Sequence, residues 1–166
     1  KVDMSDEQAV KDMVNTCNER FGSVDILVNN AGIFPSEPIS QMSVDSFEKV
    51  INVNLRGVFL ATKYVAEIMK PQSGGKIINI TSVDALHPSM VGLAHYDASK
   101  HGVWGFTKNS ALELAEYKIW VNAIAPGGIN TPGVVAGTSG EKMAEAAKAF
   151  LSKVPMHRMG DPDEIG

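Results

Sequence analysis

The sequence predicts an α/β fold built on a doubly wound parallel sheet, and the alternation of two kinds of segment predicts it. Three short runs, 24–30, 76–82 and 118–125, have the length of strands and are largely apolar, as parallel strands covered on both faces are. Longer segments with apolar residues at helical spacing separate these runs. Because strands that alternate with helices form parallel sheets, we expect ligands to bind at the carboxyl ends of the strands.

The first helix has clear start and stop signals. Residues 1–4 have the pattern of the tail of a strand, and residues 5–8 supply an N-cap and an acidic first turn. Apolar residues then recur at helical spacing as far as Phe21–Gly22, where the glycine marks the end of the helix. The strand at 24–30 follows and ends at Ala31–Gly32.

A second, longer helix is predicted from Ser43 toward Met69. It contains Asn54 and Gly57. Both are poor helix formers, so we expect a local irregularity inside this helix.

A third helix is predicted from Tyr96 through Leu114, and it leads into the strand at 118–125. Pro126–Gly127 ends that strand.

Composition excludes several classes of protein. The chain has 166 residues, of which 44% are hydrophobic and 20% charged, as in an ordinary soluble domain. The formal net charge of −4 gives no basic patch, so we expect neither nucleic acid nor a membrane as a partner. Cys17 is the only cysteine, which favours a cytoplasmic location without an internal disulfide. The acid and histidines of the loop 83–95 lack the ordered spacing of metal ligands, so we predict no metal site.

Tyr96 and Lys100 lie four residues apart, which places them on one helix face. A nearby ammonium favours ionisation of a phenol, so we expect Lys100 to lower the pKa of Tyr96 and to make it a proton donor. Ser82 ends an apolar strand, so the serine, tyrosine and lysine are predicted to converge. A tyrosine and a lysine one turn apart also occur on ordinary helix surfaces.

These residues form a longer pattern, which resembles the short-chain dehydrogenase/reductase family. Asn29–Gly32 close one strand, Asn54 lies in the long helix, and Pro126–Gly127 close another strand, all in the family's order. The match covers about the middle two-thirds of such an enzyme. The resemblance implies a Rossmann-type, three-layer αβα fold that binds NAD or NADP.

The resemblance also assigns roles to individual residues. The implied catalytic residues are Asn54, Ser82, Tyr96 and Lys100. The implied cofactor-binding residues are Asp3, Met4, Asn30, Ala31, Gly32, Tyr96, Lys100, Pro126, Gly127, Ile129 and Thr131.

Several of these roles have an ordinary structural alternative. Asp3 and Met4 would contact the adenine, but Asp3 is also a typical loop acid before a helix. Asn54 would hold a kink whose carbonyl anchors a water of a proton relay, or it makes a buried polar contact. Asp84 would suit a polar substrate, or it is a solvated loop acid.

By this resemblance the protein exchanges hydride between a nicotinamide dinucleotide and a carbonyl or secondary alcohol. Ser82 would hydrogen-bond the oxyanion, Tyr96 would protonate it, and Lys100 would also hold the ribose hydroxyls. A non-catalytic binding protein or degenerate fragment is the alternative, and an isomerase or dehydratase of the same family is a third possibility.

The resemblance extends to domains and assembly. Residues 132–155 resemble a mobile substrate lid with an alanine-rich helix at 141–151, and 160–165 resembles the start of the next helix. The family's glycine-rich phosphate loop does not occur in the sequence, so we expect 1–166 to be a single, incomplete domain. We expect a homodimer or homotetramer that pairs the helices at about 44–69 and 95–117.

Overall fold

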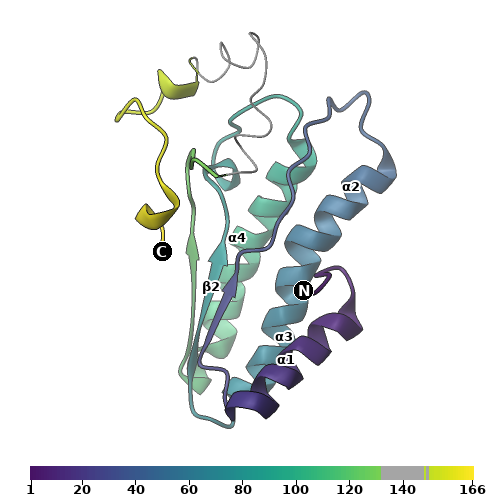
Figure 1. Ribbon diagram of the computed structural model, residues 1–166, viewed down its shortest axis with the longest axis vertical. Helices are drawn as coiled ribbons and strands as arrows, with labels where there is room; N and C mark the ends of the chain where they lie inside the picture. Colours follow the sequence, from purple (N-terminus) through teal and green to yellow (C-terminus); the bar gives the residue numbers. More distant parts are fainter. Residues whose placement is uncertain (132–147, 149) are drawn as a thin grey trace. The chain divides into compact units, whose positions relative to one another are not determined.

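The computed structural model describes residues 1–131, 148 and 150–166 (Figure 1). Its internal contacts divide the chain into two compact units, Lys1–Ala125 and Pro126–Gly166, and each unit is described by itself. Among the described residues, no helix is both long and apolar enough to cross a membrane.

The described residues of the first unit form a parallel sheet of three strands, in the order β1-β2-β3. The strands are β1 (Ile26–Asn29), β2 (Gly75–Ile80) and β3 (Ile119–Ile124). In the register, Asn29 is paired with Asn79, and Asn79 with Ala123. The carboxyl ends of all three strands therefore meet at one edge, as the sequence predicted.

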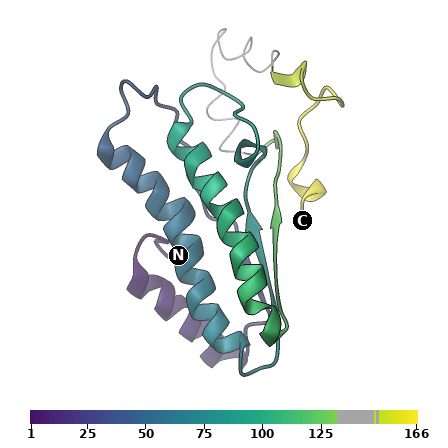
Figure 2. The ribbon, with the colours of Figure 1, turned by 180° about the vertical axis from the view of Figure 1, so that it is seen from behind.

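Helices alternate with these strands. The helices are α1 (Glu7–Phe21), α2 (Val44–Ile51), α3 (Gly57–Met69) and α4 (Ala94–Leu114). Three short helical elements accompany them: η1 (Asn52–Arg56), η2 (Val83–Ala85) and η3 (Ala115–Tyr117). Figures 1 and 2 show, from opposite sides, that α1, α3 and α4 lie on the same side of the sheet.

The core of the first unit lies between the sheet and these helices. Ile77 and Ile119 of the sheet pack with Val14, Val65 and other buried apolar residues of the helices. Each strand step runs in the same direction across the sheet, so right-handed crossovers place all the connecting helices on one face.

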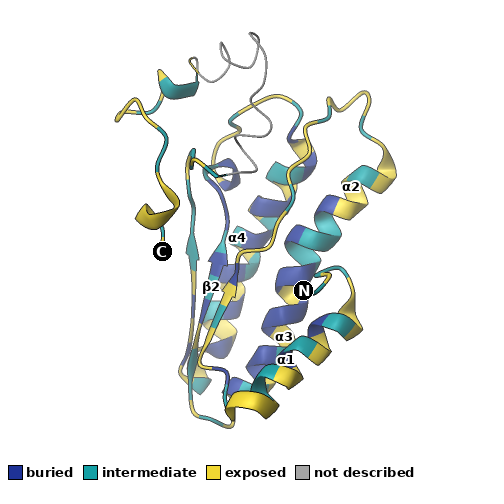
Figure 3. Cartoon of the chain, viewed as in Figure 1, coloured by how far each residue is buried: buried dark blue, intermediate teal, exposed yellow. Residues whose placement is uncertain are grey.

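The opposite face of the sheet is not covered by the described residues of this unit (Figure 3). Ile26 is 58% exposed, Val28 52% and Trp120 65%, and all three alternate with more buried neighbours along their strands. The apolar character of the strands therefore comes from two faces, of which the helices of the first unit cover one.

The ends of α1 follow the sequence signals closely. Asp6 is the N-cap and accepts a hydrogen bond from the backbone N of Ala9 at 3.1 Å, and Gly22 at the C-cap has a φ of 81°. The prediction of a strand tail at residues 1–4 was wrong. The carboxylate of Asp3 accepts from the backbone N and the hydroxyl of Ser5, at 2.9 and 2.7 Å, and this local turn replaces extended pairing.

The irregularity predicted near Asn54 and Gly57 is present. Residues Asn52–Arg56 form one turn of π-helix, and Gly57 follows it at the start of α3. A Cβ on Gly57 would lie 3.0 Å from both the Cβ and the backbone O of Met4. The glycine therefore lets the helix approach the segment before α1 closely.

We predict that Gly57→Ala lowers the free energy of unfolding by about 1 kcal/mol, because overpacking against the Met4 backbone outweighs the better helix propensity of alanine. Gly105→Ala in α4 is the matched control, since a Cβ at this position would meet no neighbouring atom within 4 Å and only propensity acts. It should raise stability by up to about 1 kcal/mol. Urea unfolding of both variants tests this, and equal signs would contradict the packing argument.

In the second unit, Ile129 and Gly160 form a parallel bridge. The short 3-10 helix η4 (Pro162–Glu164) begins with a capping box between Asp161 and Glu164, where the sequence predicted the start of a helix. Hydrogen bonding by Arg158, at 2.7 and 2.8 Å, lowers the pKa of Glu164 to about 2. Most of the predicted lid, residues 132–147 and 149, lies outside the described residues.

Candidate active site

The candidate site lies at the carboxyl edge of the sheet in the first unit. Ser82 follows β2 by two residues and is the N-cap of η2, with 7% of its surface exposed. Tyr96 and Lys100 occupy the first turns of α4, which packs against η2. Sequence-distant segments thus meet at the end of β2.

The predicted triad of side chains comes together here. Ser82 and Tyr96 lie close enough for hydrogen bonding by Ser82 to lower the pKa of the phenol. The Lys100 ammonium lies 5.6 Å from the centroid of the Tyr96 ring and donates a hydrogen bond to the backbone O of Ile80 at 2.7 Å. The three side chains therefore lie together at the end of β2, and their catalytic roles stay predictions.

The electrostatics of Tyr96 differ from the expectation. Burial raises the pKa of the phenol, Asp84 and Asp97 raise it further, and only the hydrogen bond with Ser82 lowers it. The expected lowering by Lys100 is not among the causes. Burial instead lowers the pKa of Lys100 from its usual 10.5 to about 8, because the ammonium loses its hydration.

Asn54 fastens the loop after β1 to the helices. Its amide accepts from the backbone N of Ile33 at 2.8 Å, and donates to the O of Ile33 at 2.9 Å and to the hydroxyl of Ser99 at 3.1 Å. It is fully buried, and its π-helical turn places the side chain in this position. The structure therefore shows the polar contact, and the water relay stays a prediction.

Gly32 lies against the same residues. A Cβ at this position would be 3.4 Å from Oδ1 of Asn54 and 3.6 Å from Nζ of Lys100. Both distances are ordinary van der Waals contacts, so the backbone of Gly32 lies directly beside the asparagine and the lysine.

The structure also shows a buried polar chain that the sequence analysis missed. Asn29 donates to Thr62 at 3.3 Å and to Asn79 at 2.8 Å, and Asn79 donates to Thr107 at 2.8 Å. It crosses from α3 through β1 and β2 to α4, just below the site. The signal in the sequence was an asparagine at an inward position of two neighbouring strands, and it was readable only once the register was known.

Asp84 is buried, which contradicts one of the two alternatives considered from the sequence, and the other, a contact with a polar substrate, stays a prediction. It is 6% exposed, so it is not a solvated loop acid, and both of its oxygens accept hydrogen bonds within the chain. Oδ2 accepts from the Ser82 hydroxyl at 3.0 Å, and Oδ1 accepts from the backbone N of Ser89 at 2.7 Å. Its carboxylate belongs to the framework of the site.

Besides Tyr96 and Lys100 on α4, the predicted cofactor-binding residues of the first unit lie at two places. Asn30, Ala31 and Gly32 are found directly after β1, where Asn30 and Ala31 are exposed. Asp3 lies in the turn before α1, where hydrogen bonds from Ser5 lower its pKa most and the charge of Lys49 lowers it further.

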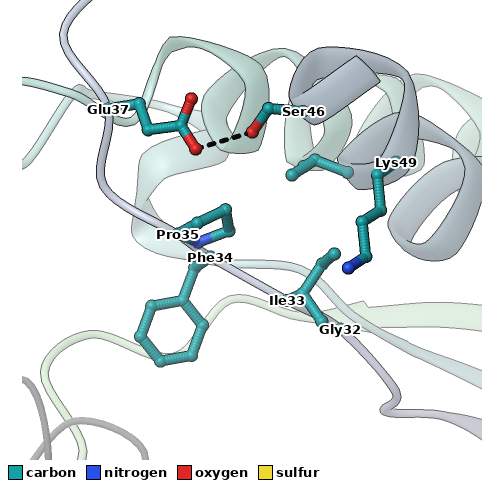
Figure 4. A pocket seen from close by; sticks show the side chains of 8 residues that line it. Gly32, Ile33, Phe34, Pro35, Glu37, Ser46 and Lys49 are labelled. Carbon is teal, nitrogen blue, oxygen red and sulfur yellow. Dashed lines mark hydrogen bonds between the residues drawn. The ribbon is translucent and has the colours of Figure 1, made fainter. Parts of the chain in front are cut away.

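A pocket of about 490 Å³ opens beside Gly32 (Figure 4). The backbone segment Gly32–Pro35 forms one wall, and α2 forms the other with Val50 and Lys49. Figure 4 shows the Lys49 side chain extending toward Gly32 and Ile33, while Glu37 accepts a hydrogen bond from Ser46 at 2.8 Å. The pocket combines an apolar wall with a cation.

The other predicted cofactor residues, Pro126, Gly127, Ile129 and Thr131, belong to the second unit. Within it, the backbone N of Thr131 donates to the O of Ile129 at 2.9 Å. In the part of the chain that the structure describes, no three or more His, Cys, Asp or Glu residues form a group that could hold a metal ion.

Comparison with known proteins identifies the family. A family model described as short chain dehydrogenase matches residues 1–142. The chain belongs to the short-chain dehydrogenase family, as the sequence pattern indicated.

Similar proteins support this assignment and the fold. The chain is 40% identical over 165 residues to a 3-oxoacyl-[acyl-carrier-protein] reductase of Thermotoga maritima, covering 99% of this chain and 64% of the relative. It is 41% identical over 167 residues to levodione reductase of Leifsonia aquatica, covering 98% of this chain and 62% of the relative. A crystal structure of levodione reductase matches with a TM-score of 0.92 at 40% identity, over 99% of this chain and 65% of that one.

The Rossmann-type α/β class predicted from the sequence is thereby confirmed. The chain spans 62% to 64% of the length of the two curated relatives.

Proposed function

We propose that the protein carrying this chain is an NAD- or NADP-dependent oxidoreductase that transfers hydride between the nicotinamide and a carbonyl or secondary alcohol. The observation that carries the proposal is the convergence of Ser82, Tyr96 and Lys100 at the carboxyl edge of the sheet. Membership in the short-chain dehydrogenase family supports it.

The residues present fit a dinucleotide. Gly32 exposes backbone beside the buried ammonium of Lys100, where a Cβ would occupy space 3.6 Å from Nζ. The adjoining pocket offers the apolar side chain of Val50 and the cation of Lys49. Asn30, Gly32 and Lys100 would hold the dinucleotide, and when bound its nicotinamide ring supplies or accepts the hydride.

The chain's own residues supply the proton chemistry. When a carbonyl carbon gains hydride, its oxygen becomes negative, and Tyr96 donates a proton to it. The raised pKa of Tyr96 keeps the phenol protonated at neutral pH, which suits a proton donor in carbonyl reduction. Lys100, with its pKa near 8, carries an ammonium proton that it can release close to neutral pH.

The names of the relatives suggest the substrate class. One relative is a reductase of 3-oxoacyl groups and the other a reductase of levodione. Both names denote ketones, so we propose a small ketone or secondary alcohol as the substrate and a cytoplasmic location.

A binding and turnover experiment tests the proposed function. NADH and NADPH fluorescence titrations should show saturable binding of at least one dinucleotide, and a panel of ketones should then yield alcohols. Binding without turnover of any ketone or alcohol would favour the non-catalytic alternative, while products of unchanged oxidation state would favour an isomerase or dehydratase. Failure to bind either dinucleotide would contradict the proposal.

We also propose a homodimer or homotetramer that pairs α3 and α4. Phe59 of α3 is 44% exposed and contacts Phe106 of α4 edge-on, with ring centroids 6.3 Å apart. Leu112 of α4 is 78% exposed. An apolar surface of this kind is typical of a face that a partner covers.

Light scattering tests the assembly, and Phe59→Lys should shift the mass toward the monomer because a charge in an apolar interface is costly. Glu19→Lys, which places a lysine at an exposed position of α1 outside the proposed interface, is the control for a nonspecific charge effect. A monomeric unsubstituted protein would contradict the proposal.

A further inference from the structure

Asp84 has an unusual position for an acid beside a proton donor. It follows Ser82 by two residues in η2, and both carboxylate oxygens are engaged in hydrogen bonds inside the loop, to the Ser82 hydroxyl and the backbone N of Ser89. Its own backbone N also donates to the Ser82 oxygen, at 3.1 Å. A buried carboxylate bonded on both oxygens is held in one place.

These bonds account for most of the hydrogen-bonding capacity of Ser82. A serine hydroxyl has one proton and two lone pairs. The proton is directed at Asp84 Oδ2, and one lone pair accepts the backbone N–H of Asp84. One lone pair remains that can accept from the phenol of Tyr96, whose pKa hydrogen bonding by Ser82 lowers.

We propose that Asp84 is a positioning residue, whose buried carboxylate holds the proton of the Ser82 hydroxyl and so fixes the serine oxygen against the phenol of Tyr96. The proposal rests on the proposed function, in which Tyr96 is the proton donor. It adds a carboxylate to the serine, tyrosine and lysine that the sequence pattern indicated.

The position of Asp84 has a second consequence, because Asp84 and an ionised Tyr96 would compete for the same proton of the Ser82 hydroxyl. When the phenol ionises, the Ser82 proton can turn from Asp84 to the phenolate, which explains why this hydrogen bond lowers the pKa of Tyr96. The negative charge of Asp84 acts in the opposite direction and raises that pKa. Asp84 therefore opposes ionisation of Tyr96 both by competing for the proton and by its charge.

Other groups around the phenol also affect the pKa of Tyr96, and a test must distinguish their effects from that of Asp84. Among the described residues, α4 contributes Asp97, which also raises the pKa of Tyr96, and Lys100, 5.6 Å from the ring centroid. The charges of His101 and His95, on the same helix, lower the pKa of Asp97. The loop after β1 contributes the uncharged ring of Phe34, whose centroid lies 6.0 Å from that of Tyr96.

Nuclear magnetic resonance of protein labelled with ¹³C at the tyrosine ring tests the proposal without cofactor or turnover. The chain has three tyrosines, and Tyr96→Phe assigns the signal of Tyr96. Asp84→Asn and Asp97→Asn should each lower the pKa of Tyr96, because each removes one negative charge. These two variants are matched in charge, but only Asp84→Asn disturbs the bond to Ser82.

A double-mutant cycle with Ser82→Ala separates positioning from charge. Ser82→Ala should raise the pKa of Tyr96 in the unsubstituted chain and by an equal amount in the Asp97→Asn background. In the Asp84→Asn background the rise should differ from that in the unsubstituted chain by roughly half a pKa unit or more, because the carboxylate no longer holds the Ser82 proton. Equal rises in all three backgrounds would overturn the proposal and leave Asp84 as a charge only.

Two further measurements keep the test decisive. If Asp84→Asn does not fold, Asp84→Glu keeps the charge but moves the carboxylate by one methylene, and it should lose the coupling to Ser82 while the charge effect on Tyr96 persists.

In active protein, Asp84→Asn should shift the alkaline limit of ketone reduction to lower pH and leave the dinucleotide dissociation constant unchanged. Absence of turnover in the unsubstituted protein would refute the proposed function alone, because the tyrosine titration does not depend on it.

Discussion

Replacing Tyr96 by phenylalanine is expected to lower turnover by roughly 10²-fold or more, because the variant keeps the ring but has no proton to donate to the developing oxyanion. The dinucleotide dissociation constant should change little, since the hydroxyl is expected to act on the substrate oxygen. The edge contact of the ring with Phe34 should survive, so the fold should be kept.

Steady-state turnover and dinucleotide binding, measured separately, check this prediction. Tyr117→Phe is the matched control, because it removes the same hydroxyl from η3 at the far end of α4 and should leave turnover near its original value. Near-full turnover by Tyr96→Phe would exclude Tyr96 as the acid.

The second large effect concerns Lys100, where activity and stability are expected to change in opposite directions. Lys100→Met should abolish most turnover and weaken dinucleotide binding, because it removes a charge and an expected contact to the cofactor. It should also raise the free energy of unfolding at neutral pH by on the order of 1 kcal/mol. Lowering the pKa of the lysine from 10.5 to about 8 corresponds to a burial cost of roughly 3 kcal/mol, and loss of the bond to Ile80 offsets part of that gain.

The pH dependence of stability identifies the cause. Between pH 8 and 10.5 the unfolded chain binds more protons at Lys100 than the folded chain, so unfolding of the unsubstituted chain becomes harder as pH rises through this window. The burial cost is fully present below pH 8 and is relieved toward pH 10.5. Lys100→Met should lack this rise, as denaturant unfolding at several pH values would show. Parallel pH profiles for the two chains would contradict the account.

The sequence predicted the parts of the site that depend on spacing and on strand ends. Tyr96 and Lys100 were recognisable because helical periodicity fixes their relative position, and Ser82 because an apolar run ends just before it. A local irregularity near Asn54 and Gly57 was predicted because both residues disfavour regular helix, and the structure shows that it is a π-helical turn. Three strands and three helices of the first unit followed from apolar periodicity and capping signals, and the structure divides the long helix predicted from Ser43 to Met69 into α2, η1 and α3.

Some features were missed because they depend on local hydrogen bonds or on tertiary packing. The tail of a strand expected at residues 1–4 was wrong because the local bonds of Asp3 with Ser5 compete with extended backbone. The direction of the pKa shift of Tyr96 required the burial of its ring and the position of Asp84, and neither follows from spacing along a helix. The bond from Asn29 to Asn79 likewise required the strand register.

Transfer of deuterium from the reactive ring carbon of reduced nicotinamide to a ketone tests the central claim most directly. The protein would be given labelled NADH or NADPH with a cyclic diketone or a 3-oxoacyl thioester, and the product analysed by mass spectrometry. We predict one deuterium on the carbon that bears the new hydroxyl, with a yield reduced by roughly 10²-fold in Tyr96→Phe. Alcohol without the label, or labelled alcohol formed equally well by Tyr96→Phe, would contradict the account.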